Sequence, residues 1–382
     1  MPLVEDDNNF EAGQEKYWLG FSRVAGIGVV RLRRLHEYFG NLGDAWRAGA
    51  AELLMAGLEP KLIERTLVMR ATLELDREME RLAKQGIRIL LKGGPEYPAR
   101  LAQTENAPPL LYCKGGLTVQ DDLALAVVGT RQATTYGRQA TSQLCRELAQ
   151  HRVSIVSGLA KGIDTAAHRA TLEAGGRTIA VLGCGPDIAY PPENKALMQQ
   201  IIEGGAVLSE YPPGVQPEAA NFPPRNRIVS GMTMGVLIVE AGLKSGALIT
   251  VSFANEQGRD VFAVPGSIFS KMSDGPNNLI RQGARTVTCA ADILEELQIS
   301  PLAGQVEVRE LQGDDEVERA LLRLLNSGAG EGLHVDELGR ESGLPISLVS
   351  STLTMMELKG TVKHLGAMKY AAARYTRLSK GV

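Results

Sequence analysis

The sequence contains little cysteine, few aromatic residues and no long hydrophobic run. Its four cysteines lie far apart without a C-x-x-C pair, which indicates neither a disulfide framework nor a zinc site; they are Cys113, Cys145, Cys184 and Cys289. The apolar run at residues 123–128 is far shorter than the roughly 20 residues of a membrane-spanning helix, and the acidic N-terminal segment lacks the positive charge of a signal peptide. We therefore expect a globular protein of the cytoplasm.

Motifs of several enzyme classes are also missing. No G-x-x-x-x-G-K-[ST] sequence provides a P-loop, and no Ser or Cys occupies a G-x-S-x-G elbow. Gly183-Cys184-Gly185 begins like a dinucleotide fingerprint, but Ile188 stands where the third glycine should be. Asp164 and His168 lie one helical turn apart and could serve a hydrolase, although a capping aspartate and a structural histidine are the commoner explanation. We expect no catalysis, no cofactor and no metal site.

The net charge of −3 is small but unevenly distributed. Residues 123–285 contain 15 Lys and Arg against 12 Asp and Glu, whereas residues 286–312 contain 1 against 5. Because the local field governs the encounter with a polyanion more than the total charge does, the glycine-rich centre is the region that favours such a partner. The excess of three positive charges is modest and does not identify the partner by itself.

The centre of the chain repeats an order of apolar strand, glycine turn and helix. The strand segments are continuously apolar, which is typical of strands covered on both faces. We place them at 125–128, 153–156, 178–182, 206–208, 236–239 and 261–264. The helix at 137–151 has the single apolar face of a crossover helix. The predicted fold class is therefore α/β, with a Rossmann-like, doubly wound parallel sheet.

Composition and pattern divide the chain into four segments. We expect an N-terminal helical domain at 1–85, an extended Rossmann-like domain at 86–299, a linker at 300–313 and a winged-helix-like domain at 314–382. Short strands are expected at 87–91 and 110–113. The order that predicts a winged helix is helices at 316–325, 335–342 and 345–359, followed by a hairpin at 361–370.

The roles of the two end domains stay open at this point. Residues 24–30 resemble a helix-hairpin-helix turn of the kind found in SAM-like domains, which can present amides to a DNA backbone or can serve only for packing. In the winged unit, the helix that would read DNA contains Ser, Thr and Glu but no basic residue. This composition favours a protein-contact or regulatory role.

Basic side chains follow several of the expected strands. Gly129-Thr130-Arg131 follows the first strand and Gly158 to Lys161 the second, and there we expect free backbone amides and cations that bind phosphate. Further charges come from Arg225-Asn226-Arg227 and Lys244, so five basic groups would share one sheet edge. The alternative for each arginine is an ion pair with a carboxylate such as Asp164, Glu210 or Glu240.

Four aromatic residues fall in or beside these loops, namely Tyr136, Tyr190, Tyr211 and Phe222. Single-stranded nucleic acid typically stacks its bases on aromatic rings that stand next to cations. Packing explains any one of them more simply, and Phe222, close to Arg225, is the best candidate for stacking.

These blocks closely resemble the DNA-processing protein A family (DprA, also called Smf), in the right order over about residues 125–285. The blocks that carry the resemblance are 128–131, 157–164, 209–211, 222–228, 240–241, 245–250 and 262–267. The flanking units are similar to the optional end domains of that family, with lower specificity. Thr130 stands where family members usually have Ser, a change that keeps the hydroxyl.

The resemblance implies a single-stranded DNA-binding recombination mediator that protects incoming DNA during natural transformation and helps to load the recombinase RecA. It also implies a homodimer formed through the central domain. The binding residues that carry over from the family are Arg131 and Lys161 and, less directly, Arg225, Arg227 and Lys244. Removing the charge of either Arg131 or Lys161 should weaken binding and reduce its salt dependence by the equivalent of about one phosphate contact.

The competing class is an enzyme, because the central fold also resembles lysine-decarboxylase-like phosphoribohydrolases of nucleoside monophosphates. Those enzymes have a Pro-Gly-Gly-x-Gly-Thr-x-x-Glu loop with a catalytic acid. Residues 242–251 occupy the corresponding position here and supply no such Glu. The sequence therefore favours binding over turnover.

Overall fold

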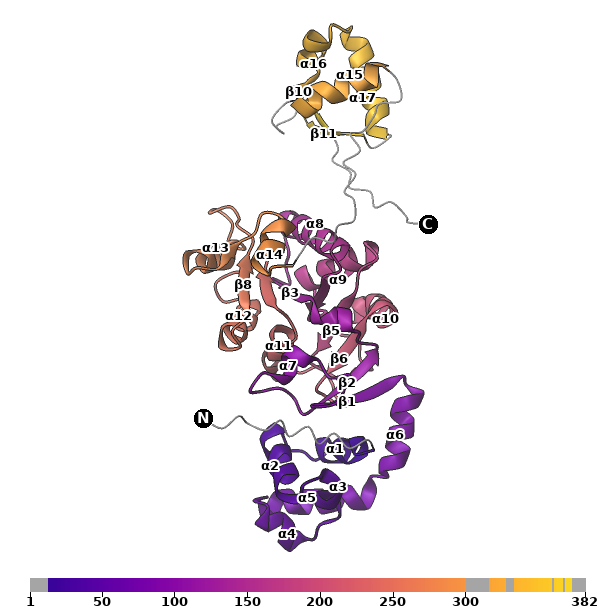
Figure 1. The fold of residues 1–382 in the computed structure, drawn as a ribbon, viewed down its shortest axis with the longest axis vertical. Helices are drawn as coiled ribbons and strands as arrows, with labels where there is room; N and C mark the ends of the chain where they lie inside the picture. The colour runs from indigo at the N-terminus through magenta and orange to yellow at the C-terminus, as the bar shows by residue number, and fades with distance from the viewer. Residues whose placement is uncertain (1–12, 300–315, 328–332, 359–360, 367, 373–382) are drawn as a thin grey trace. The chain divides into compact units, whose positions relative to one another are not determined.

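The computed structural model describes residues 13–299, 316–327, 333–358, 361–366 and 368–372. The chain divides into two compact units, residues 1–300 and 301–382 (Figure 1). The expected linker at 300–313 lies outside the described residues, and the bounds of the four expected segments stay predictions. Within the described residues, no helix is both long and apolar enough to cross a membrane.

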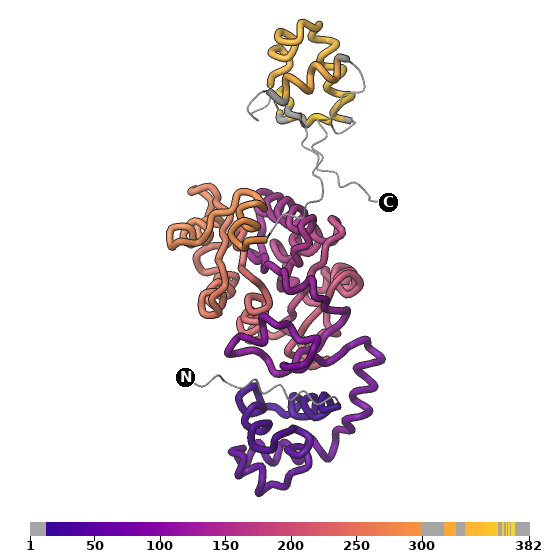
Figure 2. The backbone as a smooth tube through the Cα atoms, in the orientation of Figure 1, coloured from indigo at the N-terminus to yellow at the C-terminus, as the bar shows by residue number. Residues whose placement is uncertain are grey.

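The first unit opens with helices, as the sequence predicts (Figure 2). They are α1 (Glu15–Ser22), α2 (Val29–Phe39), α3 (Leu42–Arg47), α4 (Ala50–Met55), α5 (Pro60–Thr72) and α6 (Leu75–Lys84). Gly26, in the turn between α1 and α2, has a φ of +100°, a conformation that favours glycine. The apolar residues Leu32 and Leu35 of the hairpin are buried with Phe21 and Trp46. This hairpin therefore contributes its apolar face to a core.

A nine-stranded sheet follows, in the order β1-β2-β6-β5-β4-β3-β7-β8-β9. Its strands are β1 (Ile87–Leu91), β2 (Leu110–Gly115), β3 (Ala124–Val128), β4 (Ser154–Ser157), β5 (Thr178–Leu182), β6 (Ala206–Ser209), β7 (Gly235–Ile238), β8 (Asp260–Ala263) and β9 (Arg285–Thr286). The pairs β1–β2 and β2–β6 are antiparallel, and the remaining pairs are parallel. All six strands expected in the centre are present, each within one residue of its predicted ends.

Helices cover both faces of this sheet and produce its two-sided core. They are α7 (Ala99–Ala102), α8 (Thr135–Gln150), α9 (Ile163–Glu173), α10 (Lys195–Gly204), α11 (Phe222–Gly231), α12 (Ala247–Glu256), α13 (Asp274–Arg281) and α14 (Ala290–Glu296), with short 3₁₀ turns η1 (Val119–Asp122), η2 (Pro192–Asn194) and η3 (Ala219–Asn221). On β3, Leu125 and Val127 pack with Leu144 of α8, whereas Ala126 packs with Ile228 of α11 on the opposite face. This alternation explains why the strands are apolar throughout.

The N-terminal helices pack on the antiparallel edge of the sheet. Leu19 of α1 and Leu82 of α6 are buried against Ile87 and Tyr112. The hydroxyl of Tyr112 lies 2.9 Å from Oγ of Ser22, and burial raises the pKa of this tyrosine to about 12. The helical region and the sheet thus share a continuous apolar contact.

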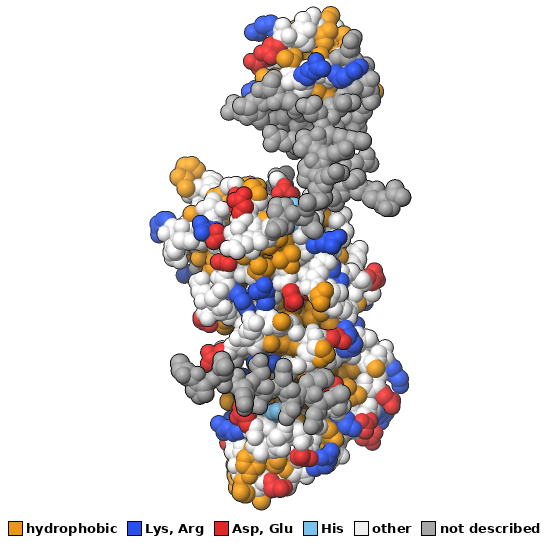
Figure 3. All heavy atoms as spheres, in the orientation of Figure 1, with side chains coloured by type: hydrophobic (Ala, Val, Ile, Leu, Met, Phe, Trp, Pro, Cys, Tyr) orange, Lys and Arg blue, Asp and Glu red, His pale blue; other side chains and the backbone are white. Residues whose placement is uncertain are grey.

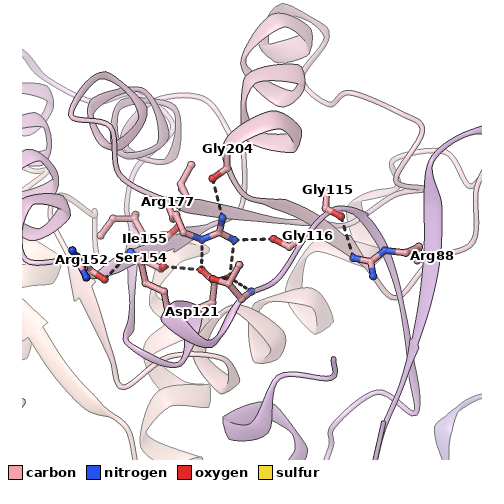
Figure 4. A network of polar contacts seen from close by, with 12 residues as sticks. Arg88, Gly115, Gly116, Asp121, Arg152, Ser154, Ile155, Arg177 and Gly204 are labelled. Carbon is pink, nitrogen blue, oxygen red and sulfur yellow. Dashed lines mark hydrogen bonds and ion pairs between the residues drawn. The ribbon is translucent and has the colours of Figure 1, made fainter. Parts of the chain in front are cut away.

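One arginine–aspartate pair joins the strand ends opposite the carboxyl edge of the parallel sheet (Figure 4). Arg177 precedes β5 and donates through Nε and Nη2 to Asp121, at 3.1 and 2.9 Å. Its remaining donors reach the carbonyl oxygens of Gly116 and Gly204, at 2.8 and 3.3 Å. Asp121 also accepts a hydrogen bond from Ser154 at the start of β4. A single ion pair therefore ties together the ends of β2, β3, β4, β5 and β6.

The second unit contains α15 (Glu316–Ser327), β10 (Leu333–His334), α16 (Val335–Ser342), α17 (Ile346–Leu358), β11 (Val362–Gly366) and β12 (Lys369–Ala372). The strands form an antiparallel sheet in the order β10-β12-β11. Leu321, Leu338, Leu353 and Val362 are buried together. The three predicted helices and the hairpin are present, while β10 is an additional strand that its two-residue length hides from sequence patterns.

Candidate nucleic-acid interface

The strand order of the parallel sheet reverses at β3. From β3 the chain proceeds through β4, β5 and β6 to one side, and it then returns to β7 and β8 on the other side. The loops after β3 and β7 therefore diverge and leave a crevice at the carboxyl edge, which is where open α/β sheets bind ligands. A cavity of 610 Å³ lies at this point. Its lining includes Gly129, Thr130, Arg131, Gly158, Asp164, Phe222, Arg225 and Asn226.

On the face shown in Figure 3, Lys and Arg side chains of the first unit are interspersed with Asp and Glu. Because no large patch of one sign dominates this view, the geometry of individual groups at the cavity is what bears on an anionic ligand.

The loops after β3 and β4 pass very close to each other. The Thr130 amide donates to the carbonyl of Glu240 at 2.7 Å, and the Thr130 carbonyl accepts from the amide of Ile163 at 3.2 Å. Gly162 has a φ of +78°, and a Cβ placed on it would lie 2.3 Å from the Thr130 oxygen. Only glycine permits this approach, which brings Arg131 beside the loop that follows β4.

The carboxylate of Asp164 uses amides that the sequence suggests for phosphate. It accepts hydrogen bonds from the amides of Gly158 and Ala160, at 3.1 and 3.3 Å. The expectation of free amides in these loops is therefore wrong for Thr130, Gly158 and Ala160, because the protein itself satisfies them. Burial raises the pKa of Asp164, against the opposing effects of Arg225 and the two amides.

Arg225 is buried at the base of the cavity, with 5% of its surface exposed. Its Nη1 donates to the carbonyl of Gly158 at 2.9 Å and also to the carbonyl of Val181. A Cβ on Gly158 would lie 2.5 Å from Nη2 of Arg225, so this glycine makes room for the guanidinium. Burial lowers the pKa of Arg225, and the nearby carboxylate of Asp164 opposes that shift. Arg225 thus places a fixed positive charge at the base of the cavity.

Phe222 joins the two arginines of the cavity. The guanidinium carbons of Arg131 and Arg225 lie 5.6 and 5.9 Å from its ring centroid. The ring of Tyr190 lies 5.5 Å away, tilted by 34°. Arg131 is exposed, and within the described residues no carboxylate pairs with it. The arrangement combines an open cation with an aromatic platform, which are the groups that bind phosphate and base in single strands.

The other predicted basic residues do not line the cavity. Lys161 forms an ion pair with Glu193 at the surface. Arg227 pairs with Glu210 at 2.7 Å, which is the carboxylate alternative considered from the sequence. Lys244 is exposed and lies outside the lining. Asn226 does line the cavity, with its Nδ2 3.4 Å from the carbonyl of Gly246.

His168 does not line the cavity. It is fully buried, and its Nδ1 lies 2.7 Å from the hydroxyl of Thr178. Burial and the charge of Arg225 lower the pKa of His168 to about 3, which keeps the ring neutral. Asp164 and His168 therefore have structural environments and do not face one ligand. Among the described residues, no cluster of three His, Cys, Asp or Glu side chains could hold a metal ion.

The other side of the cavity is closed by residues that the sequence analysis did not count among the binding residues. Ser245, Gly246 and Thr250, around the start of α12, belong to the lining, together with Pro217 from the loop before α11. The Ser-Gly-Ala-Leu-Ile-Thr block contains three of these residues, but it offers no charge that would mark it as a binding segment.

Comparisons with known proteins match both units. A family model described as DNA recombination-mediator protein A matches residues 88–298, and one described as the DprA winged helix domain matches residues 305–368. The chain is 36% identical to Protein Smf of Synechocystis over 94% of this chain and 98% of that protein.

Two solved structures are also similar. The X-ray structure of DNA processing protein A from Streptococcus pneumoniae has 37% identity and a TM-score of 0.65, covering 74% of this chain and 97% of that one. DNA processing protein A from Helicobacter pylori, studied for its single-stranded DNA binding mode, has 32% identity and a TM-score of 0.50, covering 56% of this chain and 95% of that one.

Proposed function

The chain belongs to the DNA recombination-mediator protein A family, and from that premise we propose that it binds single-stranded DNA at the cavity between β3 and β7. The observation that carries the proposal is the group formed by Arg131, Phe222 and Arg225. The exposed guanidinium of Arg131 binds a phosphate through two hydrogen bonds, and a base stacks on the Phe222 ring. Neither contact reads base edges, so the binding has little sequence preference.

Each of the remaining cavity groups has a supporting part in this proposal. Arg225 contributes charge without moving, because backbone carbonyls hold its guanidinium. Asp164 fixes the loop after β4 through its two amide contacts. The binding needs no metal or cofactor, and it includes no chemical step. The residues that bind DNA in this proposal include Gly129, Thr130, Gly158 and Asn226 of the lining, with Lys161, Arg227 and Lys244 outside it.

The cellular role proposed with this binding is that of a recombination mediator. The protein protects incoming single strands during natural transformation and loads RecA on them, acting as a homodimer. The support is membership of the family and similarity to a protein studied for single-stranded DNA binding. Faster RecA assembly on DNA already coated with a single-strand-binding protein is the expected result, and no acceleration would refute this role.

The DNA-binding proposal is tested by fluorescence anisotropy of labelled oligo-dT, with matched duplex and AMP as competitors, over a salt series. We expect preference for the single strand. Arg131→Ala should weaken binding about tenfold and reduce the salt slope by about 0.7, the value for one phosphate contact on a single strand. Arg281→Ala removes an exposed arginine outside the cavity lining and should behave like the parent protein.

Two outcomes would contradict the proposal. Equal binding by Arg131→Ala and the parent protein would remove the cavity as the DNA site. Preferential binding of AMP with release of ribose phosphate would instead identify an enzyme, the alternative class raised by the sequence.

A further inference from the structure

A second, more polar cavity adjoins the first one. It has a volume of 400 Å³ and lies between α8 and α9. Arg138 and Arg146 line it from α8, and Arg169 lines it from α9. Arg138 and Arg146 are eight positions apart, which corresponds to about 12 Å along the helix. We call this cavity the helix groove.

The charge of the helix groove is strongly one-sided. Its lining contains four arginines, counting Arg131, and one acidic residue, Glu173. Glu173 pairs with Arg146 at 2.8 Å in an exposed contact, which is a weak interaction in water. Arg138 donates to the carbonyl of Ala133, and no carboxylate pairs with Arg169 within the described residues. At least three guanidinium charges are therefore left without a carboxylate partner.

The helix groove continues the DNA site without a break in the lining. Arg131 and Gln132 line both cavities, so a strand leaving the first cavity meets the groove next. Ala166 and Ala170 form part of the groove lining, and such small side chains leave room for a backbone between the helices. Sequence spacing alone did not predict this groove, because its three helical arginines lie on two different helices.

The composition of the groove selects its partner. Interfaces with proteins are usually centred on buried aromatic or large aliphatic side chains, and none lines this groove. Exposed guanidinium groups in a row match successive phosphates, which they bind through two N–H donors. On the basis of the proposed function, we infer that the helix groove binds the phosphodiester backbone of the single strand as it leaves the cavity between β3 and β7.

The test compares oligo-dT lengths from about 4 to about 16 nucleotides, the range of single-strand site sizes, by fluorescence anisotropy over a salt series. The groove variant is Arg138→Gln with Arg169→Gln. The matched control is Arg152→Gln with Arg281→Gln, two exposed arginines outside both cavities. All three proteins should unfold at the same temperature, because the exchanged side chains are exposed.

For the parent protein and the control, affinity should rise with length until the strand fills the groove. The groove variant should stop gaining affinity at a shorter length and bind the longest strand about tenfold more weakly at about 0.1 M salt. Its salt slope should fall by about 1.4, corresponding to two phosphate contacts. Binding of the shortest strand, which occupies only the first cavity, should be unchanged.

The outcomes distinguish failure of the groove inference from failure of the proposed function. If the parent protein binds every length and the groove variant binds each length with the same affinity, the groove inference is overturned while the proposed function stands. If the parent protein binds no length, the proposed function fails and takes the inference with it. If the variant loses affinity for poly-glutamate but keeps full affinity for oligo-dT, the groove is a site for an acidic protein segment and the inference is overturned.

Discussion

Two arginines at opposite ends of the same sheet have very different surroundings. Arg177 has its donors matched by the carboxylate of Asp121 and by carbonyls of two neighbouring strand ends. Arg131, at the carboxyl edge, is exposed beside Phe222 and has no carboxylate partner within the described residues. The first arrangement is complete without a ligand, whereas the second leaves charge available. The same type of side chain therefore stabilises the fold at one end, and at the other it keeps the charge that the proposed function uses for binding.

The largest effect should come from removing the ion pair between Asp121 and Arg177. Asp121→Ala leaves the guanidinium of Arg177 without its carboxylate in a mostly buried place, which should lower the free energy of unfolding by about 3 kcal/mol. Urea denaturation followed by circular dichroism measures this loss. Asp76→Ala breaks an exposed pair with Lys16 and is the control, with an expected loss below about 1 kcal/mol. Equal losses of unfolding free energy in the two variants would contradict the special contribution of the Asp121–Arg177 pair.

The next effect concerns the cavity at the carboxyl edge of the sheet. Phe222→Ala removes the ring that contacts both cavity arginines and should weaken oligo-dT binding by about 1–3 kcal/mol, the range measured for base stacking. Phe269→Ala is the control, because that ring is 93% exposed and lies outside the cavity. Isothermal titration calorimetry gives both affinities. A result in which the two variants bind alike would remove stacking from the mechanism.

A third prediction uses the buried His168 of α9, which contacts Thr178 at the start of β5. Its pKa is about 3 in the folded protein and about 6.5 when unfolded, so below pH 6.5 the unfolded chain binds a proton that the folded chain does not. Stability should therefore fall with decreasing pH, by up to about 1.4 kcal/mol per unit between pH 6.5 and pH 3. The raised pKa of Asp164 acts in the opposite direction, because its proton stabilises the folded state at low pH.

His168→Gln isolates the histidine contribution, since glutamine can hydrogen-bond but does not titrate. Denaturation midpoints measured at several pH values should decline less steeply in this variant than in the parent protein. Parallel curves for the two proteins would show that His168 does not contribute to the acid sensitivity.

The smallest effect is expected for Lys161. Its ammonium already pairs with Glu193 and does not line the cavity, so Lys161→Ala should weaken oligo-dT binding by less than about threefold. This is a weaker, partial contribution to DNA binding than the full phosphate contact expected from the sequence, and less than the loss expected for Arg131→Ala. Salt-dependent anisotropy of the two variants decides the point, and equal slopes would show that Lys161 makes a full phosphate contact.

The fold was largely predictable because its strands are buried on both faces. Thr178–Leu182 and Ile87–Leu91 coincide with their predicted ranges, since a continuous apolar run between turns allows little choice of boundary. The order of strands at the edges was not predictable in the same way. The pairing of β2 with β6 depends on contacts between residues almost a hundred positions apart, and no local pattern records them.

The position of the cavity was predictable, and its lining only partly so. The glycine turns located the loops, and Arg131 after β3 meets Phe222 and Arg225 of α11 in one cavity. The sequence could not show that Arg227 pairs with Glu210 or that Asp164 occupies the loop amides. Those outcomes depend on which of several nearby partners each side chain reaches, and hydrogen-bond geometry decides that only in the folded chain.

The glycine contacts between the loops after β3 and β4 have a consequence for protein engineering. Gly158 and Gly162 leave no space for a side chain, so these positions fix the backbone of the cavity and cannot be used to alter it. Residues 131, 222 and 226 point into the same cavity and carry no comparable backbone constraint. The two sets divide the cavity into an invariant frame and an exchangeable lining. A library restricted to the lining could therefore redirect this scaffold to other anionic polymers without redesigning its loops.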